Sequence, residues 1–157
     1  MSDVELATVP KPSWTLSDAS TVPEKWDMGR VSAGQSSAQE TFLFWNNKGG
    51  AEVVSDMQDT LITTTDNAGD TLDVVADKWV EVRCNSADEE DFVQIGGTET
   101  HNIKARGQAD GVIKGTANDG LITDTDNFAS LTFYTTPPLN VQPGKRPFKL
   151  RAIYYFT

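Results

Sequence analysis

Hydrophobic and polar residues alternate along several short stretches of the chain, which is the pattern of β-strands with one buried face. Near the C-terminus, Ala129, Leu131 and Phe133 fall on one face of a predicted strand. The dipeptide Pro137–Pro138 ends that strand because proline cannot donate to a strand ladder. The last predicted strand places these residues on one face: Phe148, Leu150, Ala152, Tyr154 and Phe156.

Further strands follow from the same alternation. Residues 40–46 carry apolar side chains on both faces, which predicts a central strand, and the sequence Asn-Asn-Lys-Gly-Gly turns the chain after it. In residues 78–84, Val80, Val82 and Cys84 share one face, which predicts a half-buried strand in which Cys84 is a small core residue. Shorter strands are predicted at residues 91–95, 101–105 and 112–114, and a returning strand is predicted to begin at residues 51–54.

These strands predict the fold class. Around eight short strands, separated by turns every 8 to 12 residues, are typical of an antiparallel β-sandwich. No window of 11 or more residues shows helical periodicity with helix caps. We therefore predict an all-β protein whose domain covers residues 26–157.

The first 25 residues are predicted to form an extended N-terminal arm. Their prolines interrupt any helix, and neither the helical nor the strand period runs through them. Trp14 and Leu16 give the arm two apolar anchors. The arm either lies against its own domain or reaches a neighbouring subunit. The candidate contact residues are Pro10, Pro12, Trp14 and Leu16. If the arm reaches a neighbour, deleting residues 1–23 is expected to leave the domain folded and to reduce its assembly.

Composition and charge restrict the classes of function and partner that fit this chain. The 157 residues carry a net charge of −10, which repels phosphate backbones and anionic membrane surfaces. A single cysteine, Cys84, forms no disulfide within the chain. The N-terminal sequence lacks the basic and apolar regions of a secretory signal peptide, so we expect synthesis in a cytoplasm.

One short segment occurs twice. Residues 61–67 and 121–127 differ only at Thr64 and Asp124, but the similarity ends at the edges of the segment, which argues against a duplicated domain. The oxygens of Asp66, Asn67 and Asp70, or of Asp124, Asp126 and Asn127, suggest a calcium site. Neither copy has EF-hand spacing, and we favour the interpretation that both copies end a strand in the same turn.

Catalytic patterns are scarce. The single histidine, His101, lies in a polar run, and no Gly-X-Ser-X-Gly motif presents a serine nucleophile. The acidic run at residues 87–91 is interpreted as a solvated loop. We therefore expect no enzyme activity, metal or cofactor. The aromatic side chains that suggest a carbohydrate-binding surface, an alternative function, are Trp79, Tyr134, Tyr154 and Tyr155.

Two stretches resemble a known group of proteins. The first places Gly29, Val31, Gly34, Asn46 and Gly49 as in the opening of immunoglobulin-like domains. The second, residues 138–157, is similar to the last hairpin of immunoglobulin-like virion structural proteins of tailed bacteriophages and prophages. The resemblance implies an immunoglobulin-like sandwich in a tail, baseplate or capsid accessory protein. Its expected partners are other virion proteins and copies of itself.

Overall fold

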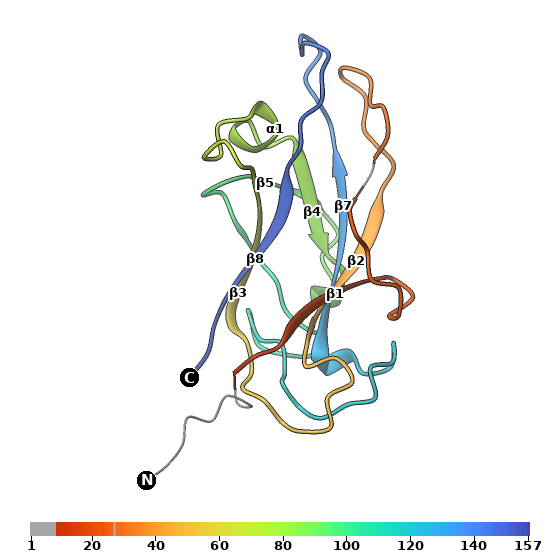
Figure 1. The fold of residues 1–157 in the computed structure, drawn as a ribbon, viewed down its shortest axis with the longest axis vertical. Coiled ribbons are helices and arrows are strands. Elements are labelled where there is room, and N and C mark those ends of the chain that lie inside the picture. Colours follow the sequence, from red (N-terminus) through yellow and green to blue (C-terminus); the bar gives the residue numbers. More distant parts are fainter. Residues whose placement is uncertain (1–8, 27) are drawn as a thin grey trace.

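Two antiparallel sheets pack face to face in a computed structural model that describes residues 9–26 and 28–157 (Figure 1). This arrangement confirms the predicted all-β sandwich. The five-stranded sheet contains, in spatial order, β1 (Pro12–Leu16), β2 (Glu40–Asn46), β7 (Phe128–Thr135), β4 (Val80–Cys84) and β5 (Val93–Ile95). The three-stranded sheet contains β6 (His101–Asn102), β3 (Gln58–Thr65) and β8 (Lys149–Tyr155).

The inner face of the five-stranded sheet follows the predicted alternation. Val80, Val82 and Cys84 of β4 are completely buried, as are Leu131 and Phe133 of β7. β4 pairs with β7 so that Val82 lies opposite Phe133 and Cys84 lies opposite Leu131. Side chains that point inward from paired strands thus form a continuous apolar layer.

The second sheet covers that layer. Ile62 of β3 is fully buried, and Leu150, Ala152 and Tyr154 of β8 pack against the same core. The predicted inward face of the last strand is therefore confirmed for these residues. Phe156, which was expected on the same face, follows the strand and is exposed.

Among the described residues, three short helical turns lie between the strands. They are α1 (Asp73–Ala76), η2 (Asn85–Ala87) and η3 (Thr125–Asn127). Val74 and Val75 of α1 are buried against the core. A four-residue turn falls below the length at which helical periodicity becomes visible in a sequence, and its burial depends on tertiary contacts.

The predicted returning strand at residues 51–54 is wrong, since β3 begins only at Gln58. Side-chain amides bind backbone carbonyls in the segment before β3. Asn47 donates to the carbonyl of Glu52 (2.7 Å), and Asn46 donates to the carbonyl of Ser55 (3.0 Å). These side-chain amides supply hydrogen-bond partners that a strand ladder would otherwise provide. The strand expected at 101–105 is only two residues long and is β6. In place of the strand expected at 112–114, the structure has a single bridge between Met57 and Ile113.

Residues 12–16 of the predicted arm lie against their own domain, which is one of the two expected alternatives. β1 pairs antiparallel with β2, from Pro12 opposite Asn46 to Leu16 opposite Phe42. The Trp14 ring packs 4.9 Å from that of Phe44, and Leu16 also contacts the core. Of the other candidate contact residues, Pro10 is buried and Pro12 is exposed. Residues 1–8 lie outside the described part of the chain.

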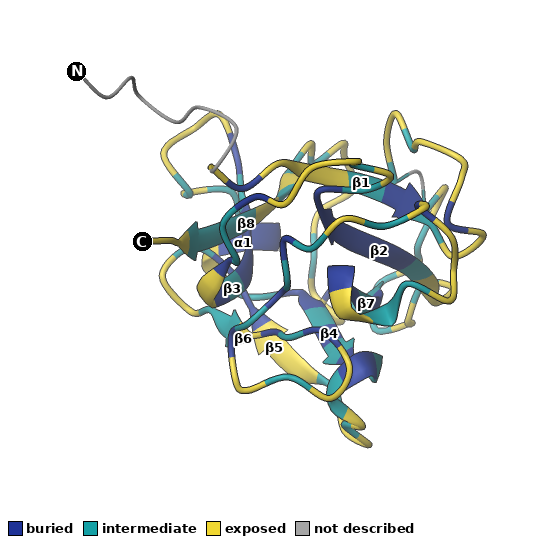
Figure 2. Ribbon diagram, turned by 90° about the horizontal axis from the view of Figure 1, so that it is seen from below, coloured by how far each residue is buried: buried dark blue, intermediate teal, exposed yellow. Residues whose placement is uncertain are grey.

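The outer face of β2 explains why both of its faces are apolar. Leu43 and Trp45 point away from the main core and form a second cluster with Phe128 and Ala19. The Trp45 indole donates to the hydroxyl of Thr15 (2.9 Å), so its polar atom is satisfied as well. Figure 2 shows β2 buried along most of its length.

The turn after β1 carries Ala19 onto this second cluster. The Asp18 carboxylate accepts backbone hydrogen bonds from Ser20 and Thr21, each at 2.9 Å, and one from the Thr21 hydroxyl. These bonds favour the ionised form, and the Thr21 hydroxyl contributes most to lowering the pKa of Asp18 to about 2. The turn is therefore held by a charged group.

This turn makes folding stability depend on pH. Because the Asp18 pKa is lower in the folded chain than its ordinary value of 3.8, its contribution is complete above that pH and disappears as pH falls through about 2. The difference in unfolding free energy between the natural chain and Asp18→Asn is expected to shrink across this window. Urea unfolding at a series of pH values measures it. A difference that stays constant down to pH 2 would contradict the assignment.

Trp14 tests whether β1 belongs to the domain. Trp14→Ala removes a half-buried ring from Phe42 and Phe44, and we expect a loss of about 2 to 3 kcal/mol in unfolding free energy. The control is Val22→Ala at a residue that is 74% exposed, expected to change stability by less than about 0.5 kcal/mol. Chemical denaturation compares the two. Equal stability of both variants would show that residues 12–16 are not part of the sheet.

Candidate interaction site

A groove of about 1160 Å³ opens between the loops at one end of the sandwich. One wall is formed by residues 25–26 and 28–33 and the other by residues 141–148. Most of these residues belong to the loops at the top of Figure 1. Val74 of α1, Trp79 and Thr135 line the region between these walls. The groove therefore lies where β7 ends and the chain crosses to β8.

Trp26 anchors the first wall. Its ring contacts Phe42 and Phe133 of the five-stranded sheet at 6.2 and 5.8 Å between ring centroids. It also contacts Phe148, which precedes β8, at 5.8 Å in an edge-to-face arrangement. Such pairs add to the stability gained by burying apolar area. One aromatic cluster therefore joins the walls of the groove to the core.

Arg146 anchors the second wall. Its guanidinium donates to Asp73 (2.8 Å) and to the carbonyls of Gln142 (2.6 Å) and Gly144 (3.0 Å). The same group lies 5.1 Å from the centre of the Trp79 ring, within the range of a cation–π contact. The planar donor fork of arginine suits this task because it binds several acceptors in one fixed geometry. Arg146 thus closes its own loop and ties it to α1.

The groove is basic in an acidic protein. Four of the 13 lysine and arginine residues line it, while none of its described lining residues is aspartate or glutamate. Arg146 is compensated by Asp73, but within the described chain Arg30 and Lys145 form no ion pair and both are exposed. The groove is therefore a local positive region beside half-buried apolar side chains.

This site was not predicted from the sequence. The available signal is the pair of adjacent basic residues between prolines in residues 141–147. Nothing in the sequence shows that Arg30, more than a hundred positions away, lines the same groove. Only the folded chain brings these segments together.

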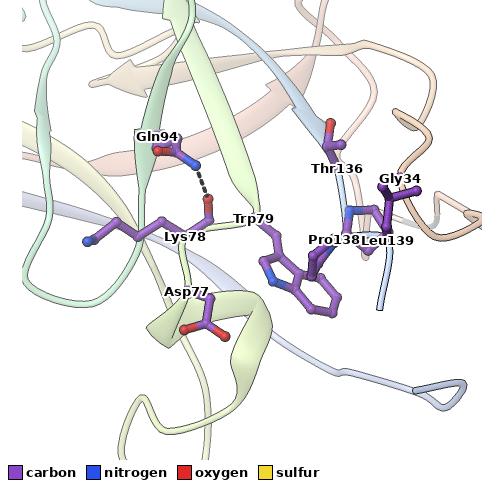
Figure 3. A pocket seen from close by; sticks show the side chains of 9 residues that line it. Gly34, Asp77, Lys78, Trp79, Gln94, Thr136, Pro138 and Leu139 are labelled. Carbon is purple, nitrogen blue, oxygen red and sulfur yellow. Dashed lines mark hydrogen bonds between the residues drawn. The ribbon is translucent and has the colours of Figure 1, made fainter. Parts of the chain in front are cut away.

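A smaller pocket of about 500 Å³ lies beside the groove and shares Trp79 and Pro137 with it (Figure 3). Gln94 donates to the carbonyl of Lys78 (3.2 Å) at its edge. Trp79 is only 8% exposed, and its indole nitrogen has no hydrogen-bond partner within the described residues. Leu139, which is 85% exposed, closes the pocket on the opposite side.

The first copy of the repeated segment ends a strand, as predicted. Residues 61–65 complete β3, and the Asp66 carboxylate accepts the backbone N–H groups of Ala68 (2.7 Å) and Asp70 (2.9 Å) in the turn. The Thr65 hydroxyl donates to Asp70, and this bond lowers the pKa of Asp70 together with the Asp66 N–H. The carboxylates that suggested calcium thus accept bonds from the protein itself.

The second copy adopts a different structure, so the prediction of one shared turn is wrong. Ile62 is fully buried, whereas its counterpart Ile122 is 50% exposed in the loop before η3. The differing residue fits each of the two structures. The Asp124 carboxylate accepts the N–H of Leu121 (2.8 Å) and closes a local turn, whereas Thr64 is buried in β3, where a carboxylate would lose its hydration.

The final asparagine of the second copy is buried and structural. Asn127 donates to the carbonyls of Lys114 (3.0 Å) and Thr116 (2.9 Å) and accepts a bond from the Thr116 hydroxyl (3.3 Å). Its counterpart Asn67 is exposed. These bonds link the loop at residues 114–116 to the start of β7.

The two asparagines form a matched pair for mutagenesis. Asn127→Ala leaves buried carbonyls without donors, so we expect a loss of about 2 kcal/mol in unfolding free energy. Asn67→Ala, in the other copy, is expected to cost less than about 0.5 kcal/mol. Thermal and urea unfolding compare the two variants. Equal losses would restore the view that both copies have the same structural role.

The candidate catalytic residues have structural partners. His101 lies on the edge strand β6, and its Nε2 is 2.8 Å from a carboxylate oxygen of Glu89. Glu89 also accepts the backbone N–H of Cys84 (2.8 Å), so part of the acidic loop is held in place instead of being freely solvated. Cys84 itself is buried in the core. His101 and Glu89 thus connect the acidic loop to the second sheet.

The four aromatic residues proposed as a carbohydrate platform do not share a face. Tyr154 packs against the core, while Tyr155 on the same strand is 59% exposed. The Tyr134 ring contacts the Phe92 ring at 4.7 Å between centroids. Burial raises the pKa of Tyr134, and a hydrogen bond with Glu81 raises it further. Trp79 lies under Arg146. The structure therefore does not assemble them into one stacking surface.

Within residues 9–26 and 28–157, no group of three or more His, Cys, Asp or Glu side chains is arranged to hold a metal ion. The same part of the chain contains no helix with the length and apolar character of a membrane span.

No model of a known protein family matches this chain, and no curated protein is similar to it in sequence.

Proposed function

We propose that this protein is a non-enzymatic structural subunit of a phage-type virion. It acts through contacts with other virion proteins and with copies of itself, in a tail, baseplate or capsid accessory position. It is assembled in the host cytoplasm and functions in the particle. The proposal starts from the resemblance of residues 26–157 to immunoglobulin-like virion proteins, and fold resemblance alone does not fix function.

The basic, apolar groove is the single observation that carries the proposal. It encloses about 1160 Å³, compared with about 500 Å³ for the neighbouring pocket, and it lies on a sandwich whose described buried side chains are almost all hydrogen-bonded or packed. A rigid sandwich that presents one charged apolar surface suits stable binding to another protein, since little freedom is lost on association. His101, Glu89 and Cys84 are already engaged in structural contacts.

The proposed function is tested in particles purified from a strain that carries the gene. We expect the chain to co-purify with particles through a density gradient in a fixed ratio to the other structural proteins, as measured by quantitative mass spectrometry. Its absence from washed particles would overturn the proposal. A glycan array probed with the purified chain and with Tyr155→Ala tests the alternative, and binding that Tyr155→Ala abolishes would favour a carbohydrate-binding module.

Two truncations separate folding from assembly. Deleting residues 2–8 leaves all eight strands intact, so we expect an unchanged unfolding midpoint and reduced incorporation into particles. Deleting residues 2–16 removes β1 with Trp14 and is expected to destabilise the domain itself, by about 3 kcal/mol or more. Because β1 pairs with β2, this outcome replaces the expectation that the domain stays folded without residues 1–23. Normal incorporation of the shorter truncation would show that residues 2–8 make no assembly contact.

A further inference from the structure

We propose that the groove binds residues 2–8 of a second copy of this chain, so that copies join end to end. The inference deepens the proposed structural role by naming the partner of the groove. It rests on the chemistry of the groove, the sequence of the segment, and the position of each on the sandwich.

The groove offers two kinds of contact side by side. Arg30 and Lys145 supply exposed positive charge, and they stand on opposite walls. Val31, Val141 and Phe148 supply half-buried apolar surface between and beneath them. An occupant that fits must present negative charge on one side and apolar side chains on the other.

The N-terminal sequence Ser-Asp-Val-Glu-Leu-Ala-Thr has this pattern. Asp3 and Glu5 alternate with Val4 and Leu6. In an extended peptide, successive side chains point to opposite faces, so the two acids share one face and the two aliphatic side chains share the other. This short segment thus combines negative charge, which complements the basic side chains of the groove, with apolar side chains that can pack against its apolar surface.

A chain cannot fill its own groove with this segment. β1 begins at Pro12 opposite Asn46, at the end of the sheet where β7 begins, whereas the groove lies beyond Thr135, where β7 ends. The eight residues of β7 span roughly 25 Å, but the chain from Val9 back to Glu5 spans at most roughly 14 Å. Figure 1 shows the start of the described chain and the groove loops at opposite ends of the molecule. The occupant is therefore a second copy.

The geometry of this contact determines the type of assembly. The segment on one copy and the groove on the next are different surfaces, so the contact is heterologous. After the first contact the pair of copies keeps one free segment and one free groove. Repetition gives a ring when the rotation closes and a filament when it does not. Rings and filaments are both repeating assemblies, so the contact is consistent with the proposed function.

Salt alone is a poor test of this contact. Two copies that each carry a net charge of −10 repel one another, and added salt screens this repulsion together with the local attraction in the groove. Charge reversal separates the two effects, because it changes the local pairs and can be compensated on the other partner.

A peptide titration tests the inference directly. The peptide of residues 1–11 is added to the chain lacking residues 2–8, and binding is measured by calorimetry. We expect saturable one-to-one binding that weakens about tenfold or more for Arg30→Glu/Lys145→Glu, because two attractive pairs become repulsive. The control, Lys149→Glu/Arg151→Glu, makes the same charge change on exposed residues of β8 outside the groove and is expected to bind nearly as well as the natural sequence.

The compensating peptide makes the test specific. A peptide with Asp3→Lys/Glu5→Lys is expected to bind Arg30→Glu/Lys145→Glu better than it binds the natural groove. A scrambled peptide of equal composition is expected to bind at least tenfold more weakly than the natural one. No binding at millimolar peptide, or equal binding to groove and control variants, would overturn the inference.

Light scattering of the full chain completes the experiment. We expect mass to increase with concentration for the natural chain and to stay monomeric for the truncation that lacks residues 2–8. A truncated chain that associates as strongly as the natural one would also overturn the inference. Presence of the chain in particles without peptide binding would reject this contact alone, whereas peptide binding without presence in particles would reject the proposed virion role.

Discussion

The packing of aromatic rings between the two sheets is the interaction on which the rest of the structure depends. Phe42 and Phe133 from neighbouring strands lie 6.0 Å apart, and Trp26 from a loop and Trp14 from β1 pack onto Phe42. Trp26 also contacts Phe148, which carries the cluster to the second sheet. Because these large rings contribute much of the apolar area buried on folding, they fix the N-terminal strand, the sheet spacing and the groove walls together.

Away from the rings, buried amides hold the loops. Asn46, Asn47 and Asn127 donate to carbonyls of segments that form no ladder, such as those at Ser55, Gly115 and Thr116. A loop that crosses a sandwich end must satisfy its carbonyls, and side-chain amides do this without a partner strand. These amides thereby fix the loops at the end of the sandwich where β7 begins.

Strands whose two faces differ clearly could be predicted from the sequence. β2 was located at its observed bounds, and the inward faces of β4 and β8 were identified correctly. The groove could not be predicted, because Arg30 and Lys145 become neighbours only through the crossing of two loops. β1 was interpreted as an arm for a related reason. Its five residues form a strand by pairing with β2, and this pairing depends on Trp14 reaching the core.

The repeated segment separates the contributions of sequence and tertiary structure. The sequence by itself determined that the chain forms alternating strands that bury one face, since the period of two is a local property of extended backbone. It did not determine whether a given leucine and isoleucine enter a strand. Ile62 is buried because β6 and β8 flank its strand. Ile122 lies in a loop without flanking strands, where the Asp124 carboxylate accepts the N–H of Leu121 and closes a local turn. Whether the segment forms a strand depends on partner strands from distant parts of the chain, because a ladder forms only between two segments.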